Sequence, residues 1–339
     1  MHYKRLVLVL FASVPLLAAA QSNVTVYGVA DAAISLEDTG APGVKRQTKV
    51  NSGDQSSSRF GFRGTEDLGN GLKAIFNIEG GYAIDTGAGD SALFGRRSVV
   101  GLQGDFGTVT VGREYSPIAA VGAATDILGQ GVYGSNLSAF TPANRLTRRI
   151  SNSVNYKSAP LSGFTGSAAY SAGEAASGLP SGNLKGVALE YANGPIYVGG
   201  GYHVVTRLAA GDDKEYAIGA GYKMGDLEFK TNYLVADQTG PNNKFEQANL
   251  GASMVFGQAK AFVNVQQNKT ANGAKGNTFT LAYSYTLSKR TNVYTSYASL
   301  HNNNLGVFGF NSSSTNVTPP VTALGADPRA LTVGVRHSF

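Results

Sequence analysis

Apolar and polar residues alternate along most of this chain with a period of two. Phe279, Leu281 and Tyr283 alternate with threonine, alanine and serine, as expected for a strand that is apolar on one face only. The last segment, from Leu331 to Phe339, repeats the pattern. No helical period of comparable length competes with it. The alternation therefore restricts the chain to an all-β fold made of many short strands.

Sixteen such segments are expected, and the connections between them differ in length in a regular way. The expected strands are 24–36, 57–67, 72–85, 96–104, 107–114, 151–157, 164–171, 185–192, 196–205, 215–223, 227–237, 245–255, 259–268, 277–287, 291–301 and 330–339. Tight turns such as 68–71 and 105–106 alternate with connections that are generally longer. Short turns at one end and long loops at the other are typical of an outer-membrane barrel, whereas a soluble sandwich has no reason to sort them.

The composition agrees with a barrel that needs no packed core. The chain is 42% hydrophobic and only 15% charged, as suits strands with one face toward lipid and the other toward water. Strands of about 10 residues can cross the membrane, and a barrel of this strand number has room for a water-filled lumen. We therefore predict an all-β fold, a 16-stranded antiparallel transmembrane β-barrel over residues 21–339. Disulfides and cysteine-ligated metals are excluded, because the chain has no cysteine.

Residues 1–20 carry the pattern of a secretory signal peptide. A short basic head precedes an apolar run at 6–17, and Ala18, Ala19 and Ala20 provide a small-residue cleavage site. The run is too short for a membrane anchor, which needs roughly 20 apolar residues. We expect cleavage after Ala20 and export of the mature chain.

Four motifs occur in order along the chain: NVTVYG at 23–28, SRFGFRGTEDLG at 58–69, GTVTVGR at 107–113 and the terminal HSF at 337–339. Together they resemble the beta-proteobacterial general porins of the trimeric type, over the whole length. The resemblance implies a homotrimer in the cell outer membrane of a Gram-negative bacterium, in contact with outer-membrane lipid and lipopolysaccharide. It also implies passive diffusion of small hydrophilic solutes and ions. Phe339 matches the terminal phenylalanine that the outer-membrane assembly machinery reads in this family.

Two long connections are candidates for narrowing the lumen, since long loops in compact folds are usually functional. In the porins that the chain resembles, the third outside loop folds inward, and here it corresponds to about 115–148. Its acidic residue is Asp126, and Glu114 comes just before it. The segment 116–119 lacks the acidic and aromatic residues that relatives often carry there. The other long connection, 301–329, contains asparagine and proline runs that favour an outside flap.

Strand parity predicts which charged side chains reach the lumen. On the second strand Phe60 and Phe62 mark the lipid face, so Arg59 and Arg63 are expected to point inward, where charged side chains stay hydrated.

Further arginines lie close to the long loop. Val154 and Tyr156 mark the lipid face of the sixth strand, and this parity puts Arg149 inward. Arg96 and Arg97 lie at the outer end of the fourth strand. Alternation is weak there, so one of the two is expected inside, and the resemblance favours Arg96.

These residues predict a channel that prefers anions. The expected constriction residues are Arg59, Arg63, Arg96, Arg97, Arg149, Glu114 and Asp126. Cations that face a loop with little acid raise the local concentration of small anions, and low-dielectric walls focus that field. The same arginines can instead brace the loop through Asp126, Glu114 or carbonyl oxygens, and the two roles are compatible.

Other function classes find little support. We expect no catalytic, cofactor or metal site, because His203, His301 and His337 are isolated and form no triad pattern. No nucleic acid partner is expected, since the basic residues are scattered. The alternative function is a surface barrel that acts mainly as an adhesin or structural anchor. A solute-specific channel is a third possibility.

Overall fold

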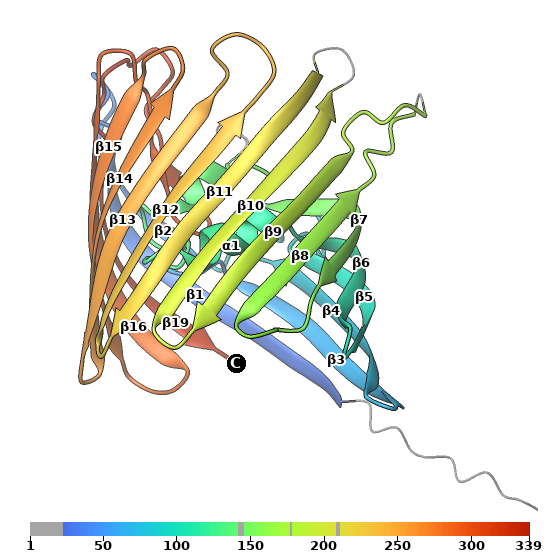
Figure 1. Cartoon of the computed structure of the whole chain (residues 1–339). Coiled ribbons are helices and arrows are strands. Elements are labelled where there is room, and N and C mark those ends of the chain that lie inside the picture. Colours follow the sequence, from blue (N-terminus) through green and yellow to red (C-terminus); the bar gives the residue numbers. More distant parts are fainter. Residues whose placement is uncertain (1–22, 142–145, 177, 208–210) are drawn as a thin grey trace, which may run out of the picture.

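The computed structural model describes residues 23–141, 146–176, 178–207 and 211–339. Apart from a separate two-stranded hairpin, the described strands form one antiparallel sheet in which the last long strand, β19 (Arg329–Ser338), pairs with the first, β1 (Asn23–Asp38). The sheet therefore closes on itself, and Figure 1 shows it as a tilted ring of strands with long connections at one end and short turns at the other.

The strands between these two follow one another around the ring. They are β3 (Arg59–Gly69), β4 (Leu72–Gly81), β5 (Arg97–Gly104), β6 (Gly107–Tyr115), β7 (Arg149–Lys157), β8 (Phe164–Ser171), β9 (Leu184–Asn193), β10 (Ile196–Arg207), β11 (Gly211–Met224), β12 (Leu227–Asp237), β13 (Phe245–Phe256), β14 (Ala259–Thr270), β15 (Lys275–Thr286) and β16 (Thr291–Asn302).

A short strand, β2 (Gln47–Ser52), was not expected from the sequence. It pairs with the C-terminal half of β1, while β3 pairs with the N-terminal half. The two strands β2 and β3 therefore share one position in the ring. Counted in this way, the described part of the chain confirms the predicted 16-stranded antiparallel barrel. The pattern at 47–52 was missed because Val50 is its one large apolar residue.

Burial along the strands is the reverse of that in a soluble protein. On β13, Leu250 points outward and is 56% exposed, whereas Gln247 and Asn249 point inward and are buried. An apolar outer face suits lipid, and a polar inner face suits water or a polar loop. Among the described residues no helix is both long and apolar enough to cross a membrane.

The connection between β6 and β7 crosses the inside of the barrel. It contains α1 (Pro117–Ala124) and the short 3-10 helix η1 (Asn136–Phe140). Ser116 caps α1 by accepting a hydrogen bond from the Ala119 N–H at 3.2 Å, and Pro117 suits the first turn. The helix lies against the inner faces of β9, β10 and β11, where Figure 1 shows it within the ring.

Side chains of the barrel wall hold this connection by hydrogen bonds to its backbone carbonyl oxygens. Asn232 donates to the carbonyl oxygen of Thr125 at 2.9 Å, and Asn264 donates to that of Gly134 at 2.9 Å. Thr280 donates to the Tyr133 carbonyl at 3.0 Å. A small apolar core lies between loop and wall and includes Ile118, Val121, Phe140, Leu234 and Phe245. Buried carbonyls need such partners, and the inward polar residues of the strands provide them.

The connection 303–328 also enters the barrel, which corrects the interpretation of 301–329 as an outside flap. It forms a small hairpin of β17 (Phe310–Asn311) and β18 (Asn316–Val317). Phe310 is fully buried, with its ring centroid 5.4 Å from that of Tyr133. The asparagine and proline runs suggested exposure, but the apolar residues between them supply the burial that turns the hairpin inward.

The C-terminal residue, Phe339, is bonded to β1 at Gly28. The Gly28 N–H donates to the Phe339 carbonyl at 3.0 Å, and the Phe339 N–H donates to the Gly28 carbonyl at 3.1 Å. A Cβ at Gly28 would lie 2.3 Å from the Phe339 ring, so only glycine leaves room for the ring to pack over this position. The predicted signal peptide, residues 1–20, lies outside the described residues.

Candidate channel constriction

Tyr115, at the end of β6, is the centre of an arginine cluster. Its hydroxyl oxygen accepts hydrogen bonds from Arg149 Nη2 at 3.0 Å and from Arg96 Nη2 at 3.3 Å. The guanidinium carbons of Arg149 and Arg148 lie 4.8 and 5.9 Å from the centroid of its ring. One aromatic side chain thus holds three cations together through hydrogen bonds and cation–π contacts.

Glu79, on β4, balances part of this charge. Its Oε1 is 2.6 Å from Arg96 Nε, and its Oε2 is 3.5 Å from Arg59 Nε. Tyr27 donates to Oε2 at 3.0 Å. Arg59 also donates to the Ser57 carbonyl at 3.0 Å. A single carboxylate is therefore paired with two guanidinium groups, and the arginine cluster keeps a net positive charge.

Both Arg96 and Arg97 face the lumen, which corrects the expectation that only one does. Arg97 stands opposite Glu79 in the β4–β5 ladder, and its Nε donates to Glu114 Oε2 at 2.9 Å. Arg96 precedes the strand, so it is free of the parity rule and turns toward Glu79.

Arg148, at the end of the loop, is a cation that the sequence did not single out for the lining. Its Nη2 donates to Gln130 Oε1 at 3.0 Å. Its Nε is buried with no hydrogen-bond partner among the described residues. Burial and the neighbouring Arg149 lower the pKa of Arg148 to about 10, which still leaves it charged at neutral pH.

Asp126 does not face the arginines, contrary to the expectation. It is 1% exposed, and its carboxylate accepts hydrogen bonds from the backbone N–H groups of Leu128, Gln130 and Asn136, each at 3.0 Å. Burial raises the pKa of its carboxyl group. Asp126 thus organises the turn that follows α1 and adds no acid to the lining.

Arg149 points into the lumen as expected, but strand parity is not the reason. The β6–β7 ladder is irregular between Gly112 and Glu114, and Asn152 has a φ of +51°. This irregularity interrupts the strict alternation that runs from Val154. The hydrogen bond to Tyr115, rather than strand parity, fixes where the guanidinium lies.

The β17–β18 hairpin completes the lining from the other side. Ser313 donates to the Gln130 carbonyl at 3.0 Å, and its own carbonyl accepts from Ser57 at 2.8 Å. Ser312 donates to Asp54 Oδ1 at 3.0 Å. The hairpin is therefore bonded both to the loop and to the segment between β2 and β3.

Three cavities lie in succession inside the barrel. The middle one, of about 480 Å³, contains Arg59, Arg96, Arg97 and Arg148 with one acidic residue, Glu79. It shares Arg96 and Arg148 with a cavity of about 390 Å³ toward the long loops. It shares Arg97 and Tyr115 with a third, of about 350 Å³, that includes Glu114 and Lys157. Shared lining residues make these cavities parts of one polar path past the loop.

Two other predicted residues lie away from the cluster. Arg63, on β3, is exposed with its guanidinium carbon 5.2 Å from the Tyr27 ring centroid. Phe339 lies on the outer face over Gly28.

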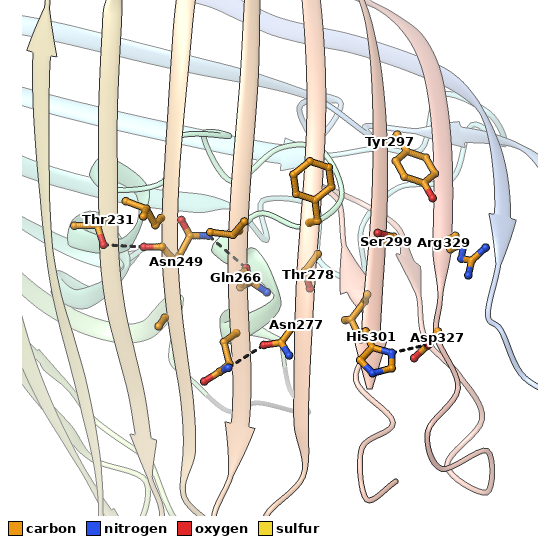
Figure 2. A pocket seen from close by; sticks show the side chains of 16 residues that line it. Thr231, Asn249, Gln266, Asn277, Thr278, Tyr297, Ser299, His301, Asp327 and Arg329 are labelled. Carbon is orange, nitrogen blue, oxygen red and sulfur yellow. Dashed lines mark hydrogen bonds and ion pairs between the residues drawn. The ribbon is translucent and has the colours of Figure 1, made fainter. Parts of the chain in front are cut away.

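A groove of about 820 Å³ lies on the outer wall across β12 to β19, outside the lumen. Figure 2 shows its labelled polar side chains, among them His301, whose ring is paired with Asp327 at 2.8 Å. Gln267 donates a hydrogen bond to Asn277 in the same groove at 2.8 Å. Exposed Leu250 and Phe279 are part of the same surface. Because this groove lies on the outer wall, it is not part of the polar path past the loop.

Sequence reasoning missed Glu79, Tyr115, His203 and Glu215. Glu79 lies at an inward position of its strand, so parity could have indicated it. His203 was treated as isolated, but it stands directly opposite Glu215 in the β10–β11 ladder. Among the described residues no group of three or more histidine, aspartate or glutamate side chains could hold a metal ion.

Comparisons with known proteins agree with this geometry. The sequence matches the Gram-negative porin family over residues 6–305. It is 30% identical to outer membrane porin protein 32 of Delftia acidovorans, covering 95% of each chain. It is also 30% identical to an outer membrane porin protein of Bordetella pertussis, over 95% of this chain and 96% of that one.

Among solved structures, the anion-selective porin from Comamonas acidovorans superposes with a TM-score of 0.82 at 28% identity, covering 94% of this chain and 100% of that chain. The extent of these matches, together with the closed barrel and its polar interior, establishes the family and an outer-membrane location. The chain belongs to the Gram-negative porin family.

Proposed function

We propose that this porin passes small anions and hydrophilic solutes by diffusion, with a preference for anions, and that the loop 115–148 sets the narrowest part of the path. The carrying observation is the charge of the middle cavity, where four arginines meet one glutamate. The similarity to a porin described as anion-selective supports the same conclusion.

The physical argument rests on charge that the protein does not neutralise. Glu79 is shared by Arg59 and Arg96, Arg97 is paired with Glu114, and Arg148 has no acidic partner among the described residues. Surrounding low-dielectric walls strengthen the resulting field, so anions are concentrated in the constriction and cations are repelled. The same hydrogen bonds also brace the loop, so the bracing role and the selective role coexist.

The native protein should show a reversal potential of the sign expected for chloride preference in a planar bilayer under a potassium chloride gradient. The expected chloride-to-potassium permeability ratio exceeds one, and it should fall as salt rises because ions screen the arginines. Cation preference would contradict the proposal while leaving the fold untouched. A folded barrel that conducts no ions would favour the adhesin or anchor function instead.

The remaining roles are proposed from position and family. Arg63 lies toward the short-turn end, where it would guide anions at the exit from the constriction. The exposed terminal phenylalanine suits recognition by the outer-membrane assembly machinery, and the apolar outer wall suits lipid, lipopolysaccharide and assembly as a homotrimer. Residues 1–20 would direct export. The protein would act as a channel and not as an enzyme.

A further inference from the structure

The two ends of the constriction loop lie side by side. The Ser116 N–H donates to the Arg148 carbonyl at 3.1 Å, and the Ser116 hydroxyl donates to the Thr147 carbonyl at 2.6 Å. The loop therefore has a narrow neck, and contacts to this neck help to fix where the loop lies in the lumen.

Glu215, on the wall strand β11, holds one side of this neck. Its Oε2 accepts a hydrogen bond from the Thr147 N–H at 3.0 Å, and its Oε1 accepts one from the Thr147 hydroxyl at 2.7 Å. The residue is 2% exposed. A buried carboxylate with two hydrogen bonds to one loop residue fixes both the position and the orientation of that residue.

His203 connects Glu215 to the other side of the neck, at Ile118. Its Nδ1 lies 3.2 Å from Glu215 Oε2, and its Nε2 accepts from the Ile118 N–H at 3.3 Å. Because the Ile118 amide is a donor, Nε2 must be the unprotonated nitrogen, and Nδ1 carries the hydrogen toward Glu215. The ring is fully buried, and a Cβ at Gly186 would lie 2.4 Å from it, so glycine makes room for it.

No other charged group among the described residues competes for this pair. On the same two strands, Asp213 is paired with Arg207 at 2.8 Å and bonded to Thr239, away from the neck. Helix α1 contributes no acidic or basic residue. On the described part of the loop, Arg148 follows Thr147 directly, and its side chain lines the middle cavity.

We propose that Glu215 is a positioning residue for the channel, which ties both ends of the constriction loop to the wall, directly at Thr147 and through His203 at Ile118. This inference rests on the proposed function, because it assumes that the loop sets the path. The ladder between β10 and β11 keeps its own backbone hydrogen bonds without this contact. Removing it therefore loosens the neck of the loop, which carries Arg148, while the other bonds between loop and wall and the closed wall itself remain.

Three variants test this assignment in planar bilayers: Glu215→Ala, Glu215→Gln and Asp213→Asn. Glu215→Ala should raise the current noise and lower the chloride-to-potassium permeability ratio by about twofold or more, since the backbone at Thr147, next to Arg148, is no longer tied to the wall. Glu215→Gln should restore native behaviour, because its carbonyl oxygen can accept from Thr147 and His203 while its amide donates to the Thr147 hydroxyl. Asp213→Asn, a buried change on the same strand and face, should also behave as native.

Thr147→Val keeps the wall intact and removes one hydrogen bond from the loop side, so it decides the matter if Glu215→Ala fails to fold. It should change noise and selectivity in the same direction and less strongly. Native noise and selectivity in folded Glu215→Ala or Thr147→Val would overturn the assignment, as would equal effects of Asp213→Asn. If the native protein itself shows no anion preference, the proposed function fails first, and the two failures are thus distinguishable.

Discussion

Replacing Arg59, Arg96 and Arg148 together with glutamine should abolish the anion preference and make the channel favour cations. A unit charge acting on an ion about 4 Å away contributes about 1 kcal/mol even in bulk water, and more near low-dielectric walls. Losing three such charges should lower the chloride-to-potassium permeability ratio by about tenfold or more, because about 1.4 kcal/mol corresponds to a factor of ten. Glu79 would then be left without its two guanidinium partners.

The reversal potential measures this effect, and two controls separate its causes. Adding Glu79→Gln to the triple variant removes the carboxylate that has lost its guanidinium partners and should return the channel to nearly equal permeability for both ions. Glutamine at the exposed Arg46, Lys289 and Arg290 removes the same net charge away from the lumen and should leave selectivity native. A triple lumen variant that still prefers chloride would show that the middle cavity does not set the preference.

Deleting Phe339 should greatly reduce the amount of folded protein in the outer membrane. The deletion removes two backbone hydrogen bonds to Gly28 and the ring that covers it. Hydrogen bonds of about 1 kcal/mol each and a lost large side chain predict a stability loss of about 2–4 kcal/mol. The folded fraction can be measured by heat-modifiable gel migration, both in cells and after refolding in detergent.

Phe339→Leu separates closure of the barrel from recognition by the assembly machinery. Leucine keeps the backbone hydrogen bonds and part of the apolar cover, so refolding in detergent should be close to native. A lower level in cells with normal refolding would support the assembly signal. Normal levels of both variants in cells would contradict the proposed role of Phe339.

The strands were predictable because lipid and water impose opposite demands on the two faces of each one. Alternation located β13 and β15 to within two residues at each end. It failed at β2, where Val50 is the one large apolar residue and the alternation is too weak to recognise. Arg149 does reach the lumen cluster, but through its contact with Tyr115, because the irregular ladder beside Gly112 interrupts the alternation from which its direction was inferred.

The partners of the charged residues were harder to predict than their directions. Parity shows that Glu215 points inward, but its contact with Thr147 depends on how the loop folds, which no local pattern encodes. Asp126 was assigned to the lining because it is an acid in an inward loop. Its carboxylate instead accepts hydrogen bonds from neighbouring backbone N–H groups and is buried among them. Sequence patterns thus predict the strands of the wall. For the enclosed loops they give the kinds of residues present but not the contacts that these residues make.

The hydrogen bonds from Asn232, Asn264 and Thr280 to loop carbonyls bear on how such a channel can diverge during evolution. Carbonyl oxygens are present whatever the side chain, so these wall residues hold the segment without reading its sequence. Substitutions on the loop face that meets the solute, such as Ala120 or Ala123, leave those bonds in place. New permeability can therefore arise by single changes in the loop, without a compensating change in the barrel.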